Sequence, residues 1–518
     1  MNGISSYLIK NVLNCIIEPV SHVFNLSVSS GVVPDQLKIA KISPIHKSGD
    51  TSDADNYRPI SLLCTFSKIL EKLIANRLVE YLDTNEIITK FQFGFRKSHN
   101  TAHPMVHLLN KISESLNQKK FSAVIFCDLK KAFDTCDHQI LLKKLSKIGI
   151  KNLELKWFES YLSNRKQFVQ IGDIKSCLLS IEKGVPQGSI LGPILFLLYI
   201  NDLPEASHFF TLLFADDTTL FMADEDLVTL TAKINTEFQK VAEYFRANKM
   251  ALHPLKTQFL LYGPNIPPEG IKIFLNNNNT NGLQDKELIS PIVQVNENSK
   301  VPAAKFLGVY FDQKLNFKTH IEKIKSKIAK SLFALRQVKN LLSDPALLSL
   351  YYSTIHCHLV YGIQIWGCAN QTTLSELYKK QKQAIRLISK AKYNAHTEPL
   401  FKQLQILPLP DLIKYFNLQF MHKFKHNSLP SSFVNSWVRQ EASIHDIRNK
   451  DDILVPRSRI NQTARLPLSE FPKLWNQFEH DEIRLLTNKF SFNKALKKHL
   501  LSLLNSVPVC NRGNCPNC

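Results

Sequence analysis

The sequence predicts an α+β fold, with strands and helices mixed over the first three hundred residues and a helical region after about Tyr351. Three observations support this class. A strand-forming run leads through a turn into a helix, two later segments alternate like β-hairpins, and the last third has mostly helical periodicity. The 518 residues are enough for two to four domains and a sizeable core.

The segment up to about Asn117 is basic and mostly helical in pattern. Within it, one stretch reads SLLCTFSKILEKLIANRLVEYL and predicts an amphipathic helix. Pro59 and Ser61 mark its expected start. Apolar residues recur on one side at helical spacing, namely Phe66, Ile69, Leu70, Leu73 and Leu78.

The middle of the chain predicts most of the sheet. A strand is expected over 121–129, followed by a turn and a helix from about His138 with Asp137 as its N-cap. Hairpins are expected in QFVQIGDIKSCLLSIEKGVPQG and in FFTLLFADDTTLFMAD, where two carboxylates lie near the turn. Between the hairpins, ILGPILFLLYI predicts a buried helix, and an amphipathic helix follows the second hairpin.

A polar tract over 276–287 has no apolar period and predicts an exposed insertion loop. Beyond it, FLGVYFD predicts a strand. The next segment is expected to be a helix, whose buried face holds Ile321, Ile324, Ile328, Leu332 and Leu335. Its lysines fall largely on other faces, where they are either solvated or available to a phosphate backbone.

The charge balance is strongly basic, with 65 Lys and Arg against 44 Asp and Glu and a formal net charge of +21. One interpretation is a well-solvated surface, and the other is a polyanionic partner such as nucleic acid. The chain shows no signal peptide, and its longest apolar run is too short to span a bilayer. Scattered cysteines suit a reducing compartment, so we expect an intracellular protein of cytoplasm and nucleus with no membrane contact.

Three carboxylates form the constellation that carries chemistry. Asp128 ends a predicted strand, while Asp216 and Asp217 lie near a hairpin turn. Such a cluster repels itself unless cations compensate it, and hard oxygen ligands with substrate phosphates suit Mg²⁺. Because side chains alternate along a regular strand, we expect Asp216 to be a stronger ligand than Asp217.

Seven motifs occur in an order that resembles the reverse transcriptases, most closely those of jockey-like non-LTR (LINE-type) retrotransposons. They are KISPIHKSGDTSDADNYRPISLL, FQFGFRKSHNT, FCDLKKAFDTCDH, GVPQGSILGPILFLLYINDLP, FADDT, HPLKTQFLLYG and KFLGVYFD. The resemblance is strong over about residues 4–390 and loose beyond, where YGIQIWGCA and QKQAIRLISKA still match.

The resemblance implies a right-hand polymerase fold and RNA-directed DNA polymerase activity. It implies fingers over 1–117, a palm over 118–300, a thumb over 301–340, a helical C-terminal region over 341–509 and a cysteine-containing tail over 510–518. Two Mg²⁺ ions, with Mn²⁺ as a substitute, would be bound by Asp128 and Asp216 with Asp217 beside them. The implied partners are an RNA template, a DNA primer, dNTPs and the element's own RNA.

Further roles follow by position from the same resemblance. Phe133 matches the steric gate against a ribose 2′-hydroxyl, although a core Phe would also fit its pattern. Gln187 and Gly188 match the lining of the nucleotide pocket. Lys47 and Arg58 match basic residues near the triphosphate.

Two basic residues have less specific signals. Lys256 matches the lysine that protonates the pyrophosphate leaving group, although a surface lysine would fit as well, and Arg96 is expected on the template backbone. Asp134 and Asp137 are interpreted as turn and cap residues instead of metal ligands. One departure is His253, where the family pattern often has Asn before Pro.

We expect the endonuclease domain of full-length elements to be absent from this chain, and no acidic constellation suggests RNase H. Two alternatives are a catalytically inactive nucleic-acid-binding relic of the same fold and an intron maturase-like splicing factor. The intact Asp128, Asp216 and Asp217 disfavour the relic, and the jockey-like motifs disfavour the maturase.

The last nine residues read CNRGNCPNC and raise a separate question. Cys515 and Cys518 have the spacing of a zinc-binding pair, with Cys510 as a third ligand and His499 as a fourth. The competing interpretation is a reduced, disordered tail.

Overall fold

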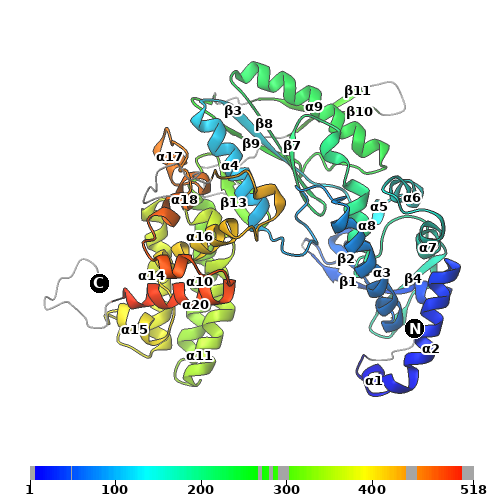
Figure 1. Ribbon diagram of the computed structural model, residues 1–518, viewed down its shortest axis with the longest axis horizontal. Coiled ribbons are helices and arrows are strands. Elements are labelled where there is room, and N and C mark those ends of the chain that lie inside the picture. The colour runs from blue at the N-terminus through cyan, green and yellow to red at the C-terminus, as the bar shows by residue number, and fades with distance from the viewer. Residues whose placement is uncertain are drawn as a thin grey trace.

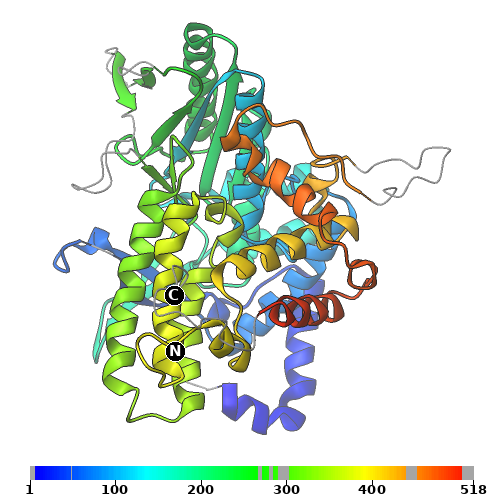
Figure 2. The ribbon, with the colours of Figure 1, turned by 90° about the vertical axis from the view of Figure 1, so that its left-hand side faces the viewer.

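The chain in the computed structural model forms a central sheet with two largely helical arms (Figure 1). The structure describes residues 6–47, 49–266, 271–278, 284–289, 303–438 and 452–504. The elements up to residue 84 and those of residues 132–200 make up one arm, and the C-terminal helices make up the other (Figures 1 and 2).

The central sheet is antiparallel and has the strand order β7-β8-β3-β9. Its strands are β3 (Phe121–Cys127), β7 (Phe210–Phe214), β8 (Asp217–Asp224) and β9 (Gln258–Tyr262). The predicted strand at 121–129 and the predicted hairpin around FADD are therefore confirmed. Helix α9 (Leu227–Ala247) follows β8 as expected.

Both faces of the central sheet are buried, which fixes its register. Val124, Leu212 and Leu260 face one hydrophobic core, which continues into the C-terminal helices. Their sequence neighbours point the other way, toward a second core with α8 (Leu191–Ile200) and α9. A one-residue slip would exchange these two sets of side chains, so the pairing is strongly specified.

The arm of lower residue numbers contains a second sheet, with order β2-β1-β4-β5 and β6 paired to β4. Its strands are β1 (Ile39–His46), β2 (Tyr57–Leu62), β4 (Arg165–Ile171), β5 (Ile174–Lys175) and β6 (Leu179–Ile181). The hairpin expected after Gln167 is confirmed. Around this sheet lie α1 (Ser6–Asn11), α2 (Leu13–Ser30), α3 (Thr65–Thr84), α5 (Ala132–Thr135), α6 (His138–Lys147) and α7 (Asn152–Leu162).

The predicted start of α3 was wrong. Pro59 and Ser61 lie in β2, and the helix begins at Thr65, after an N-cap at Cys64 whose sulfur accepts a hydrogen bond from Ser67 N. Proline is tolerated in β2 because this strand is at the edge of its sheet, where one row of N–H groups needs no partner. By contrast, the Asp137 cap of α6 is confirmed, since its carboxylate accepts from Ile140 N at 3.0 Å.

Two further segments differ from expectation. FLGVYFD is split by a turn at Leu307–Gly308 into β12 (Ala303–Phe306) and β13 (Val309–Asp312). The polar tract is not simply a loop, because 273–278 and 284–289 pair as β10 and β11. Residues 279–283 of that tract, and residues 290–302 beyond it, lie outside the described residues.

The C-terminal arm is mostly helical in its described ranges, as predicted. All five apolar residues expected on the buried face of α10 are buried. No helix within the described ranges has both the length and the apolar character that crossing a bilayer demands. The helices are α10 (Lys318–Val338), α11 (Asp344–Tyr351), α12 (Cys357–Val360), α13 (Ile363–Trp366), α14 (Gln371–Ile388), α15 (Glu398–Gln403), α16 (Leu409–Lys425), α17 (Asn461–Ala464), α18 (Pro467–Asn476), α19 (Asp481–Arg484) and α20 (Lys489–Ser502).

Helix α4 (Ala102–Asn117) joins the central sheet to this arm. It contacts β3, β7 and β8 of the sheet and also α13, α17 and α18 of the C-terminal region. Met105, Val106, Leu108 and Leu109 are fully buried between them. The sheet and the C-terminal helices therefore share one hydrophobic core.

Replacing Ile125 tests how much the burial of both faces of the central sheet contributes to the stability of the fold. Its side chain is 0% exposed in the middle of β3, so Ile125→Ala should reduce the free energy of unfolding by about 2–5 kcal/mol. Urea unfolding followed by circular dichroism measures this loss. Ile174→Ala is the control, because Ile174 is 80% exposed and its truncation should change stability by less than about 0.5 kcal/mol. Equal losses of stability in the two variants would contradict the placement of Ile125 in the core of the central sheet.

Candidate active site

Two predicted acidic residues lie at a tight turn between β7 and β8. Phe214 pairs with Asp217, so Ala215 and Asp216 alone form the connection, which we call the carboxylate turn. Ala215 has φ +55°, an uncommon backbone conformation for a residue with a side chain. Because Asp216 lies in the turn and Asp217 begins the strand, strand alternation does not by itself force the two side chains apart.

Asp128 directly follows β3 on the neighbouring strand. Cys127 pairs with Thr218, and continuing that register by one residue places Asp128 opposite Asp217. The backbone of Asp128 is held on both sides: its carbonyl accepts from His253 N at 2.8 Å, and its amide donates to Thr257 Oγ1 at 3.4 Å. The three predicted carboxylates thus meet at one end of the central sheet.

The carboxylates influence one another electrostatically. Partial burial, together with the charges of Asp216 and Asp128, raises the pKa of Asp217 to about 6. Burial and the charge of Asp128 also raise the pKa of Asp216 above its ordinary range. Both side chains remain open to solvent at the surface of the site. The cluster is therefore accessible and short of positive charge.

Basic side chains from two other elements oppose this effect. Arg58 on β2 and Lys47 after β1 lower the pKa of Asp216, and Lys47 and Lys305 lower that of Asp217. The structure therefore brings the predicted Lys47 and Arg58 toward the carboxylates. Lys305, exposed on β12, was not singled out from the sequence, although it lies within the KFLGVYFD motif.

The donor set of the site suits a hard divalent cation. Its three groups are carboxylates, and burial together with mutual repulsion raises the pKa values of Asp216 and Asp217. No sulfur or imidazole group is among the residues that shift those two pKa values. Across the described ranges, no group of three or more His, Cys, Asp or Glu side chains is already arranged to hold a metal ion. The fit to Mg²⁺ therefore rests on the oxygen donors of the three carboxylates and on their common position at one end of the central sheet.

Phe133 lies on α5, five residues after Asp128, and is only partly buried. Its ring stacks on Phe196 of α8, with ring centroids 4.4 Å apart, and meets the edge of Phe95 at 6.3 Å. Its backbone carbonyl accepts from Val185 N at 2.8 Å. One face of the Phe133 ring thus rests on the buried Phe196 ring, while part of the Phe133 side chain stays accessible.

The Gln187–Gly188 segment lies beside Phe133 and is tied to both neighbouring chain segments. Gln187 Nε2 donates to Asp134 Oδ1 at 2.9 Å, and its carbonyl accepts from Ser61 N at 2.6 Å. Gly188 has φ +116°, and a Cβ there would lie 2.7 Å from Ser61 O. Only glycine fits without strain at this close approach of two backbones. Asp134 was expected to be only a turn residue, and the structure shows that it also orients the Gln187 side chain.

Lys256 is exposed in the loop before β9. That loop is anchored to the segment around Asp128, because Lys130 N donates to Ala251 O at 2.9 Å and His253 N donates to Asp128 O. The departure from the family pattern at His253 leaves this anchor intact, because the contact uses the backbone.

Gln92 connects the FQFGFR segment to the carboxylate turn and was not singled out from the sequence. Its buried Oε1 accepts from Gly94 N at 2.8 Å and from Ala215 N at 3.1 Å. Backbone bonds between Phe93 N and Leu213 O, and between Leu213 N and Phe91 O, lay this segment along β7. In the sequence, the only sign of this role was a polar residue between two phenylalanines, Phe91 and Phe93.

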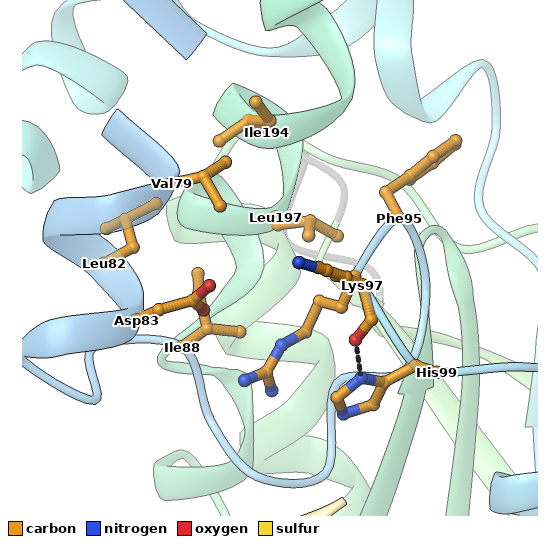
Figure 3. Close-up of a pocket in the computed structure, with 10 residues that line it drawn as sticks. Val79, Leu82, Asp83, Ile88, Phe95, Lys97, His99, Ile194 and Leu197 are labelled. Carbon is orange, nitrogen blue, oxygen red and sulfur yellow. Dashed lines mark hydrogen bonds between the residues drawn. The ribbon is translucent and has the colours of Figure 1, made fainter. Parts of the chain in front are cut away.

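Arg96 is half-buried and bonded within its own segment, because Nη1 donates to Thr89 O at 3.1 Å and Gln92 O at 3.3 Å. Burial lowers its pKa, while Asp83 opposes that shift. Arg96 lies at a cavity of about 160 Å³ between α3, α8 and the 95–99 segment (Figure 3). The cavity is lined by Val79, Leu82, Asp83, Ile88, Phe95, Arg96, Lys97, His99, Ile194 and Leu197.

The proposed zinc ligands are only partly within the described ranges. His499 lies on α20 with its ring centroid 3.9 Å from that of His480. Cys510, Cys515 and Cys518 lie outside the described residues. The cysteines inside those ranges are all free thiols.

The raised pKa of Asp217 predicts a stabilising substitution. Its folded pKa of about 6 exceeds the ordinary value of 3.8, so the ionised carboxylate destabilises the folded chain above pH 6, and the penalty fades toward pH 4. Asp217→Asn should therefore raise the midpoint of thermal unfolding at pH 8 without divalent cations, and should give no gain at pH 4. Differential scanning fluorimetry at both pH values measures this.

Asp224→Asn is the control with the opposite sign. The Lys233 hydrogen bond lowers the pKa of Asp224, so its charge stabilises the fold above the ordinary carboxyl pKa and this contribution is lost in acid. Asp224→Asn should lower the unfolding midpoint at pH 8. A lower midpoint for Asp217→Asn at pH 8 would contradict the repulsion described above.

Comparisons with known proteins indicate the family of the chain. Residues 45–311 match the family model described as reverse transcriptase (RNA-dependent DNA polymerase). The chain is 29% identical over 428 residues to the RNA-directed DNA polymerase from mobile element jockey of Drosophila melanogaster, covering 80% of this chain and 44% of that protein. It is 26% identical over 453 residues to a probable RNA-directed DNA polymerase from transposon BS of the same species, covering 81% and 47%.

The chain thus spans about half the length of the curated relatives it matches. Among solved structures, a Candida albicans telomerase in complex with a fragment of telomeric RNA aligns with a TM-score of 0.38 and 13% identity, over 74% of this chain and 68% of that one. The family model covers more than half of the sequence, including all three carboxylates, and the resemblance to jockey-like elements is confirmed. The chain belongs to the reverse transcriptase (RNA-dependent DNA polymerase) family.

Proposed function

We propose that the chain is an RNA-directed DNA polymerase of a non-LTR retrotransposon. In this reaction, the 3′-hydroxyl of a primer attacks the α-phosphate of a dNTP, a new phosphodiester bond forms and pyrophosphate leaves. The observation that carries the proposal is the meeting of Asp128, Asp216 and Asp217 at one end of the central sheet, opposite the basic side chains of Lys47 and Arg58.

We assign a right-hand architecture to the chain, with fingers over 1–117, a palm over 118–300 and a thumb over 301–340. The central sheet supports the palm assignment, because it carries the carboxylates. Two basic residues support the fingers assignment, namely Arg58 on the second sheet and Lys47 directly after β1. Helix α10 supports the thumb assignment, since it packs a mainly apolar face inward and carries many lysines.

The carboxylates are the proposed cation ligands. Asp128 and Asp216, with Asp217 beside them, would hold two Mg²⁺ ions, which when bound stabilise the charge on the attacking and leaving oxygens. The chain's own contribution is to collect the carboxylates by strand register and to anchor the Asp128 backbone through His253. Positioning and charge stabilisation account for most of the catalysis in phosphoryl transfer.

The nucleotide site is proposed around Phe133, Gln187 and Gly188. The Phe196 ring supports Phe133 from below, so the gate cannot retreat easily from a ribose 2′-hydroxyl. Gly188 lets its backbone pack directly against the backbone of Ser61, and Asp134 holds the Gln187 amide. Lys47 and Arg58 are the proposed contacts to the triphosphate.

We propose less specific roles for two further residues. Lys256 is exposed on a loop anchored beside Asp128, which suits proton donation to the pyrophosphate leaving group. Arg96 already donates to two backbone carbonyls, so a template contact would use its remaining donors. The proposed partners are an RNA template, a DNA primer and dNTPs.

The alternative is a nucleic-acid-binding relic without activity. The anchored backbone of Asp128 and the Gln92 contact that holds the carboxylate turn favour an intact enzyme. A primer-extension assay separates the two functions, since a relic would bind template and primer without extending them.

Asp216→Ala should abolish extension. Removing one carboxylate weakens the cation site and leaves charge on the reacting oxygens uncompensated, so the rate should fall at least about 100-fold. The assay uses the purified chain with an RNA template, an annealed DNA primer, dNTPs and Mg²⁺. Asp224→Asn at the far end of β8 is the control and should retain extension. Binding without extension by the wild-type chain would refute the proposed function.

Phe133→Val should relax selection against ribonucleotides. The smaller side chain leaves room for the 2′-hydroxyl, so the ratio of kcat/KM for dNTP over NTP should fall by about 10-fold or more. Single-nucleotide extension measures both values. Phe158→Val, which truncates a buried Phe of α7, is the control for loss of stability. Unchanged sugar selectivity in Phe133→Val would remove the gate role.

A further inference from the structure

Glu71 is a buried carboxylate that the proposed reaction does not use. It lies on α3 and is 1% exposed. Its Oε2 accepts hydrogen bonds from Ile190 N at 2.7 Å and Leu191 N at 3.3 Å, and its Oε1 accepts from the Tyr161 hydroxyl at 3.1 Å. One side chain thus joins α3, α7 and the start of α8.

The contacts compensate a costly burial. Desolvation raises the pKa of Glu71, whereas the two amides, Arg165 and Tyr161 oppose that shift. Arg165 is itself 1% exposed, donates from Nη1 to Tyr161 O at 3.1 Å and lies over the Tyr161 ring. The first amides of a helix lack intrahelical acceptors, so a carboxylate there satisfies them and complements the helix dipole. Losing Glu71 would leave both amides without their buried acceptor.

The start of α8 matters because it carries two parts of the nucleotide site. The Gln187–Gly188 segment immediately precedes it, and Ser189 Oγ connects that segment to the helix by accepting from Gly192 N at 2.9 Å. Further along, Phe196 supports the Phe133 ring. Ser61 and Asp134 bond Gln187 itself. Glu71 bonds Ile190 N, just after the Gln187–Gly188 segment, so the segment is held at both of its ends.

We propose that Glu71 is a positioning residue for the incoming nucleotide, because it fixes the start of α8 and thereby the Gln187–Gly188 segment and Phe133. This inference rests on the proposed function and adds to it a residue outside the site. Glu71 reaches no reacting atom, so its effect is on binding and sugar selection instead of on the carboxylates.

The test compares three variants in primer extension. Glu71→Leu removes the acceptors and should raise KM for dNTP about 10- to 100-fold, with a smaller change in kcat and weaker discrimination against NTP. Glu71→Gln keeps an acceptor oxygen for the two amides and should restore most of the KM. Glu237→Leu is the matched control, since Glu237 is also a buried carboxylate that accepts from a backbone amide, His208 N, but it lies on α9.

Hydrogen–deuterium exchange gives a readout that needs no activity. Glu71→Leu should speed exchange of the Ile190 and Leu191 amides, and Glu237→Leu should speed that of His208 instead. The inference is overturned if the exchange of Ile190 and Leu191 is unchanged, if Glu237→Leu raises KM equally, or if Glu71→Gln gives no rescue. A wild-type chain that exchanges as expected but extends no primer would refute the proposed function separately.

Discussion

The position of every proposed catalytic group depends on the central sheet having no solvent-facing side. Neighbouring residues of β3 enter different hydrophobic cores, so the strand has no alternative register that keeps its apolar side chains buried. Asp128 is simply the next residue after that strand. Its place opposite Asp217 is therefore determined by the burial of Val124 and Ile125, not by any attraction between the carboxylates, which repel.

The repulsion also explains why the site is assembled from distant segments. Nothing within the carboxylate turn neutralises Asp216 and Asp217, so the opposing charges come from Lys47, Arg58 and Lys305 on other strands. The turn itself is held by Gln92, a neutral amide that satisfies the Ala215 backbone without adding charge. An acidic residue at that position would deepen the repulsion, and a basic residue would compete with cations for the carboxylates.

Much of the fold could be predicted from periodicity, because long amphipathic helices such as α9 and α10 and the buried strand β3 have strong patterns. Strands β1 and β2 of the second sheet were missed, since β2 contains Pro59 at an edge where the usual strand preferences are relaxed. The carboxylates and the residues of the proposed nucleotide site were recognisable from motifs. Gln92, Lys305 and Glu71 were not, because their roles depend on contacts between segments that lie up to 123 residues apart in sequence.

Helix α4 makes the central sheet and the C-terminal helices parts of one structural unit. Its apolar residues are enclosed by the central sheet on one side and by α13, α17 and α18 on the other, and those helices come from the far end of the chain. The helical C-terminal region therefore completes one hydrophobic core of the central sheet. Recombination that exchanged the motif-bearing segment without the C-terminal helices would separate the two halves of one core, so the two regions are expected to be inherited together.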